Sequence, residues 1–264
     1  MTYPAKNAFA TEAHVLEAFG FKLSDGGSHI SRTMMLAELE ILLAVVPSDA
    51  GAADYRDAIL SQNALGKPTE STRSKSLRHL RELYALDPSV PIFAALRRLY
   101  ALDPDGLPLL ALLVAWARDP LLRATTPAIA AAREGERVEP VTLAREVHAA
   151  FTQYSEPNCQ KIARNTASSW TQSGHLAGRT NKVRRTVKPT TVAVTLALFL
   201  GEVAGFHGAV VFTNPWCRLL DLDADRARAL ALAAHRADLL NLRAIGDVVE
   251  LHFPSLGDLL QPVV

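Results

Sequence analysis

Apolar side chains recur every three or four residues along most of the chain, a spacing that places them on one face of an α-helix. Segment 69–84 shows this period with basic residues on its outer side, and Thr69 supplies a suitable N-cap. Segment 108–118 is apolar on most sides, which predicts a largely buried helix. The same reasoning predicts further helices at 32–43, 52–62, 127–133, 142–153, 156–173, from 190 onward, and at 224–242.

In the second half of the chain the pattern changes to helix, turn, helix and then a short alternating segment. Ser155 is placed to cap the second of these helices, and Gly174 is placed to end it. Segments 176–179 and 183–186 alternate as short strands do, with a turn at 180–181, which is the size of a wing. A last strand is predicted at 248–253. The expected fold class is mainly α: a helical bundle with helix-turn-helix or winged-helix-like segments and a few short β-strands.

A polar stretch that contains glycine, proline and several charges, 135–140, interrupts the helical pattern. This stretch predicts a boundary between two parts. Residues 1–135 are expected to form an N-terminal helical domain with a candidate helix-turn-helix. Residues 136–264 are expected to form a C-terminal domain that contains the winged-helix-like segment and the closing helices.

Composition agrees with a globular, mostly helical protein, because 49% of the 264 residues are hydrophobic and 6% are aromatic. Cys159 and Cys217 lie far apart without the spacing of zinc ligands, which favours reduced thiols. The first nine residues lack the pattern of a signal peptide, and Glu202 and His207 interrupt the apolar run 191–213. A cytoplasmic protein without a membrane partner is therefore expected.

The net charge of +1 is uninformative by itself, but the charges are unevenly placed. No Asp or Glu occurs between Glu156 and Glu202. The basic residues in this window are Lys161, Arg164, Arg179, Lys182, Arg184, Arg185 and Lys188. An acid-free window that covers a helix-turn-helix pattern and the hairpin after it favours binding to nucleic acid over an unliganded basic surface.

In a winged helix, the second helix of the pair enters the major groove and the wing lies on the phosphates. Lys161 and Arg164 of the helix are therefore expected to contact DNA, together with Arg179, Lys182, Arg184, Arg185 and Lys188 of the hairpin and beyond. The polar residues expected to face outward on the same helix are Asn158, Gln160, Asn165, Ser168 and Ser169. The alternative is a solvated basic face that binds no ligand.

Helix 69–84 is a second candidate surface, because it follows another helix and a turn. Arg73, Lys75 and Arg78 are expected on its outer face, and His79 is a further candidate. Glu70 and Glu82 lie on the same segment, and pairing with them would explain these cations without a ligand.

The sequence contains no phosphate loop, no dinucleotide-binding glycine pattern after a strand and no nucleophile elbow. No two histidines lie four residues apart, so a zinc site on a helix is not predicted. The alternating Asp221, Asp223 and Asp225 precede a helix and fit charge placement at its N-terminus better than a metal loop. We therefore expect no catalytic residues, no metal and no cofactor.

Several short patches also resemble a known family. They are Ser31-Arg32 up to Glu38, Asn63-Ala64-Leu65-Gly66-Lys67-Pro68, Ser71-Thr72-Arg73, Leu80-Arg81-Glu82-Leu83, and segments 170–176 and 201–216. In their order the chain resembles BrxA-type proteins, small non-catalytic components of bacteriophage-exclusion (BREX) defence islands. The resemblance implies a helical protein, related in part to the antitermination factor NusB, that binds double-stranded DNA beside a methyltransferase and ATPases of the same island.

The leading hypothesis from the sequence is a non-enzymatic accessory protein of a phage-defence system that binds double-stranded DNA. One alternative is a protein–protein adaptor whose helical bundle scaffolds the defence complex. Another is an RNA-binding, antitermination-like module, which would use the same cations but prefer RNA to duplex DNA.

Overall fold

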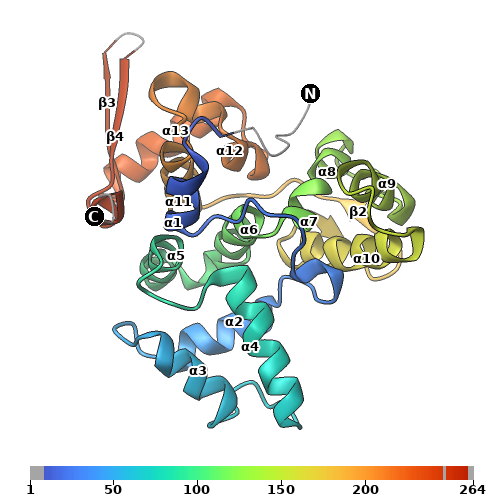
Figure 1. The fold of residues 1–264 in the computed structure, drawn as a ribbon. Helices are drawn as coiled ribbons and strands as arrows, with labels where there is room; N and C mark the ends of the chain where they lie inside the picture. The colour runs from blue at the N-terminus through green and yellow to red at the C-terminus, as the bar shows by residue number, and fades with distance from the viewer. Residues whose placement is uncertain (1–8, 246–247, 261–264) are drawn as a thin grey trace.

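The computed structural model describes residues 9–245 and 248–260, and it is mainly α-helical (Figure 1). The helices are α1 Ala13–Phe19, α2 Leu36–Val45, α3 Ala52–Leu60, α4 Glu70–Tyr84, α5 Pro91–Leu102, α6 Leu107–Arg118, α7 Pro120–Ala124, α8 Thr126–Ala131, α9 Pro140–Ala150, α10 Glu156–Gln172, α11 Thr191–Val203, α12 Pro215–Leu219 and α13 Ala224–Arg236. Two antiparallel hairpins complete the fold, β1 Leu176–Ala177 with β2 Val183–Arg184, and β3 Asn241–Ile245 with β4 Val248–His252.

Helices α6 and α11 form the centre of the bundle. Nearly every residue of α6 is buried, as its continuous apolar run predicted. Trp116 of α6 packs edge-on against Trp216 of α12, with ring centroids 5.2 Å apart. Phe199 of α11 packs against Phe19 and Phe253, which come from opposite ends of the chain. Among the described residues, no helix is both long enough and apolar enough to cross a membrane.

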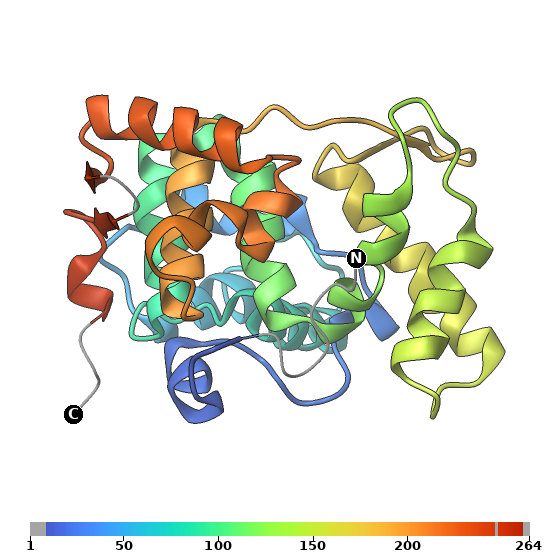
Figure 2. The same ribbon diagram turned by 90° about the horizontal axis from the view of Figure 1, so that it is seen from above.

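The predicted division at 135–140 does not separate two cores. Helix α11, which follows the division, packs on α5 and α6, which precede it, and α13 packs on α11. Buried apolar residues from both halves belong to one continuous cluster. Figure 2 shows α11–α13 beside α6 on one side of the molecule, while α8–α10 and the first hairpin lie on the other.

The second group is a winged-helix-like unit, called the winged-helix unit below, with the two-stranded sheet β1–β2 and one bridge from Arg137 to Val183. Its order is α8, a short extended segment at Arg137, α9, α10, β1 and β2. The extended segment lies beside β2: the Arg184 N–H donates to Glu136 O (2.8 Å), and the Val138 N–H donates to Lys182 O (2.8 Å). The two helices and the hairpin predicted for this region are therefore present, and the bridge between Arg137 and Val183 was not predicted.

Side-chain caps are present at the start of some helices and absent from others. Thr69 caps α4 by accepting from the Thr72 N–H, and Asp223 caps α13 by accepting from the Arg226 N–H, as predicted. Ser155 makes no such bond at the start of α10. The predicted helix 224–242 ends at Arg236, because the chain turns there into β3, a strand that was not predicted.

Candidate nucleic-acid interface

The outward face of α10 carries free cations. Lys161 and Arg164 are exposed, and neither side chain has a hydrogen bond or ion pair within the described part of the chain. Ser168 lies one turn further along the same face, and its hydroxyl donates to Arg164 O (3.0 Å). The opposite face, with Ile162 and Trp170, is fully buried in the core. The helix is thus fixed by its apolar side and presents a basic stripe to solvent.

The first hairpin continues this stripe. Lys182 Nζ donates to Thr171 Oγ1 of α10 (2.9 Å) and to Gly178 O (2.8 Å), so the hairpin is tied to the end of α10. Arg179 and Lys188 are exposed. Arg185 is exposed as well, and its guanidinium lies 3.8 Å from a Glu134 carboxylate oxygen.

Arg184 does not lie on this surface, contrary to the sequence prediction. Its residue is only 6% exposed, and the guanidinium pairs with Asp221 and donates to Ile129 O (3.1 Å). β2 ends at Arg184, and because successive residues of an extended chain point to opposite sides, the next residue, Arg185, takes the outer side. Arg184 therefore joins the winged-helix unit to the loop after α12 and is not available to a phosphate.

Two polar residues of α10 also turn inward, against the prediction. Asn165 Nδ2 donates to His29 O (2.8 Å), and Ser169, which is fully buried, accepts from the Met34 N–H (2.8 Å). Both partners belong to residues 28–36, which run along one side of α10 and are called the strap below. Because the strap makes these contacts, α2 begins at Leu36 and not at the predicted residue 32.

A chain of buried polar groups holds the strap. His29 Nε2 lies 2.8 Å from Ser169 Oγ, and His29 Nδ1 lies 2.9 Å from Asp119 Oδ2, in an orientation that makes no straight hydrogen bond. Burial alone would raise the pKa of Asp119, but His29 and the backbone donors outweigh it and keep the pKa below its usual range. The side chains of Asp119, His29 and Ser169 are all buried, so no substrate can reach them. Their contacts join the strap to the start of α7 and to α10.

The second predicted surface, on α4, is partly confirmed as exposed. Lys75 and Arg78 are exposed, but Arg73 is half-buried and its Nε is enclosed without a partner. His79 is buried, and its ring lies 3.1 Å from Ser28 Oγ and 3.3 Å from Ser31 Oγ of the strap. Arg73 and His79 are thus poorly placed to contact a ligand. The neighbouring Arg81, which was not predicted as a contact, is exposed.

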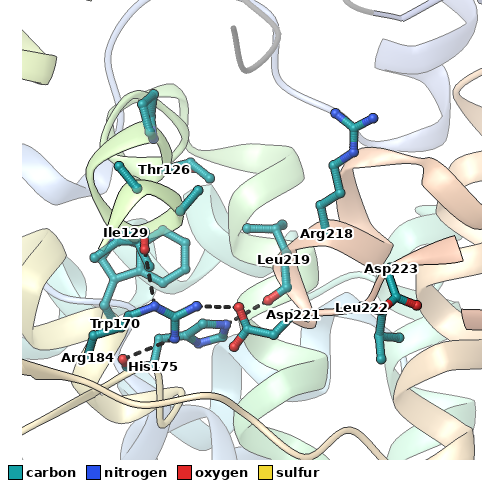
Figure 3. Close-up of a pocket in the computed structure, with 13 residues that line it drawn as sticks. Thr126, Ile129, Trp170, His175, Arg184, Arg218, Leu219, Asp221, Leu222 and Asp223 are labelled. Atoms are coloured by element: carbon teal, nitrogen blue, oxygen red, sulfur yellow. Dashed lines mark hydrogen bonds and ion pairs between the residues drawn. The ribbon is translucent and has the colours of Figure 1, made fainter. Parts of the chain in front are cut away.

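A cavity of about 490 Å³ lies where the winged-helix unit meets the loop after α12. Figure 3 shows Trp170, His175 and Arg184 reaching it from one side and Asp221 from the other, while the Arg218 side chain points away from them. His175 Nε2 lies 2.6 Å from Leu219 O, and its Nδ1 lies 2.9 Å from Ser173 Oγ. The polar groups at the base of the cavity therefore already have hydrogen-bond partners within the protein.

His175 is expected to make stability depend on pH. Burial lowers its pKa to about 4, whereas an unfolded histidine titrates near pH 6.5. Between these values the unfolded chain binds the proton more readily, so stability is lost as the pH falls from 6.5 towards 4, by at most about 1.4 kcal/mol per pH unit. Urea unfolding at pH 7 and pH 5 should show this loss in the wild type and less of it in His175→Gln. The exposed His148→Gln variant should behave like the wild type, and an equal loss in all three would contradict the assignment.

Within residues 9–245 and 248–260, no group of three His, Cys, Asp or Glu side chains is arranged to hold a metal ion. Cys159 and Cys217 are buried and unpaired, and burial raises the pKa of Cys217 to about 12. Asp221, Asp223 and Asp225 form no shared site, because Asp221 pairs with Arg184 and Asp223 caps α13. In comparisons with protein-family models and with curated proteins, the sequence matches none of them.

Proposed function

We propose that the protein binds double-stranded DNA through α10 and the hairpin β1–β2. The observation that carries the proposal is the exposed, unpaired stripe of Lys161 and Arg164 on α10, the last helix of the winged-helix unit, continued by Lys182 at the hairpin. Such a helix has the width of the major groove, and its cations lie within reach of the phosphates on either side.

The polar residues at the start of α10 complete the stripe. Asn158 and Gln160 are exposed near its N-terminus, the end that approaches base edges when a recognition helix enters the groove. Gln160 Nε2 donates to Glu156 Oε1 (3.1 Å), while the Asn158 side chain makes no hydrogen bond within the part of the chain described and is free to contact a base. Asn165 is held by the strap and is left out of this contact set.

The resemblance to BrxA-type proteins supports a setting for this activity. We propose a non-enzymatic accessory protein of a BREX-type defence system in the cytoplasm, acting beside a methyltransferase and ATPases. The adaptor and RNA-binding alternatives differ from it in measurable ways. An adaptor would still bind its partner proteins after Lys161 and Arg164 are replaced by alanine. An RNA-binding module would prefer structured RNA to duplex DNA in a competition experiment.

Removing the stripe should weaken duplex binding. Lys161→Ala/Arg164→Ala is expected to lower affinity on the order of tenfold per cation, because each substitution removes a charge-assisted phosphate contact. Fluorescence anisotropy with a labelled duplex of about 30 base pairs, roughly three helical turns, measures this directly.

The matched control is Arg56→Ala/Arg236→Ala, which removes two exposed arginines on α3 and α13. Its affinity should stay close to that of the wild type. If both double variants lose the same affinity, net charge and not the stripe accounts for binding. If the wild type does not bind duplex DNA at low salt, the proposed function is wrong and the adaptor hypothesis is favoured.

A further inference from the structure

The C-terminal half of α4 forms a wall of an open groove of about 500 Å³. Four basic side chains line the groove: Lys22, Arg78, Arg81 and Arg118. Among the described residues that line it, Glu82 is the one carboxylate. A basic groove of this kind attracts anions, because several positive charges share one concave surface.

Part of this positive charge is already used inside the protein. The Arg118 guanidinium donates to Arg81 O (3.1 Å), Glu82 O (3.1 Å) and Gly20 O, so it caps the end of α4. Glu82 accepts a hydrogen bond from Ser28 Oγ (2.5 Å). The side chains of Lys22 and Arg81, in contrast, have no hydrogen bond or ion pair within the described chain. Their N–H donors are therefore free for a ligand.

The polar side chains that line the groove follow one face of α4, where Arg78 Nη2 also lies 3.2 Å from His79 Nε2. Ser74, Arg78 and Arg81 are spaced four and three residues apart, so they lie in a row roughly 10 Å long. The phosphates of one DNA strand rise about 3.4 Å each along the duplex axis, so a row of this length matches about three of them. An open row of one serine and two arginines suits an extended polyanion better than a single small anion.

The groove and α10 lie on two sides of the same strap. Ser28 contacts Glu82 at the groove, and the next residue, His29, contacts Asn165 and Ser169 of α10. Figure 1 shows the segment that carries the strap between α4 and α10. Arg32 of the strap is partly exposed between the two elements. The two basic surfaces are thus neighbours, although they come from distant parts of the sequence.

We infer that the groove binds the sugar-phosphate backbone of the same duplex that α10 contacts, next to the stretch that lies against the recognition helix. This inference rests on the proposed function. It makes the interface bipartite: α10 and the hairpin hold one stretch of the duplex, and Lys22, Arg78 and Arg81 hold a flanking stretch. Duplex length then affects affinity, because a short duplex cannot reach both surfaces.

The test compares Lys22→Ala/Arg81→Ala with the wild type on duplexes of about 12 and about 30 base pairs, roughly one and three turns. On the long duplex we expect an affinity loss on the order of tenfold or more and a salt slope shallower by about 2. On the short duplex the variant should bind like the wild type. Arg56→Ala/Arg236→Ala is the control for charge, and unchanged melting temperatures check the fold.

The outcomes separate the two proposals. If the wild type binds and Lys161→Ala/Arg164→Ala weakens it, but the groove variant is unchanged at both lengths, the bipartite interface is wrong while the proposed function stands. An equal loss at both lengths overturns the flanking position of the groove. If the wild type binds neither duplex, the proposed function fails first.

Discussion

Replacing Asp221 with asparagine is expected to lower the free energy of unfolding by about 3 kcal/mol, because it leaves the buried Arg184 guanidinium without its anion. The asparagine keeps the size of the side chain and tolerates the left-handed backbone at this position, where φ is 56°. The loss then reflects the missing charge and the weakened bond to the Val187 N–H, which Asp221 Oδ2 accepts at 3.0 Å. Urea unfolding followed by far-UV circular dichroism measures it.

A neighbouring exposed pair supplies the control. Glu134 lies 3.8 Å from Arg185 at the surface, and both side chains are more than half exposed. Glu134→Gln should therefore cost less than about 1 kcal/mol. If the two variants lose the same stability, the Arg184–Asp221 pair contributes no more than a surface pair. The comparison also explains why Arg184 is a poor choice for testing DNA contacts, since its loss would destabilise the fold.

Affinity for duplex DNA is expected to fall roughly a thousandfold between 50 and 200 mM salt if the α10 and hairpin cations alone neutralise phosphates. Six residues remain in this set after the removal of Arg184, namely Lys161, Arg164, Arg179, Lys182, Arg185 and Lys188. At about 0.9 counterions released per phosphate contact, six contacts give a slope of about −5 in log affinity against log salt. Contacts from the α4 groove would steepen it to about −8 on a long duplex.

Anisotropy titrations at four or five salt concentrations measure the slope. Lys161→Ala/Arg164→Ala should reduce its magnitude by about 2, since two contacts are lost. Burial lowers the pKa of Lys182, and its ammonium also donates to Thr171 and Gly178 within the protein. A slope near zero, with binding retained, would show that apolar or neutral polar contacts carry the affinity.

Elements with strong local signals were predictable from the sequence. Helix α6 has an uninterrupted apolar run, α4 has the Thr69 cap with a regular period, and α10 with its hairpin combines a turn, a period of 3.6 and short alternating strands. In each of these the residues that decide the structure are close together in the chain. The bridge at Arg137 was not predicted, because its partner Val183 lies more than forty residues later in the sequence.

The site residues were predictable only as far as local position determines exposure. Lys161 and Arg164 follow from the outer face of an amphipathic helix. Arg184 and Asn165 could not be assigned, because their partners, Asp221 and His29, lie 37 and 136 residues away in the sequence. A partner that is distant in the sequence can turn a polar side chain of a helix or strand towards the interior. The local sequence pattern does not identify that partner.

The path of the chain between α7 and α11 has a mechanical consequence. The chain leaves the bundle after α7, builds the winged-helix unit and returns at α11, while the strap and the Arg184–Asp221 pair hold the unit at two further points. A domain at the end of a flexible linker samples many orientations, whereas the winged-helix unit is inserted in the chain and held at these points. If it binds DNA as proposed, the duplex takes one orientation relative to the bundle. Any protein that docks on the bundle would then stand at a set angle and distance from the helical axis of the duplex.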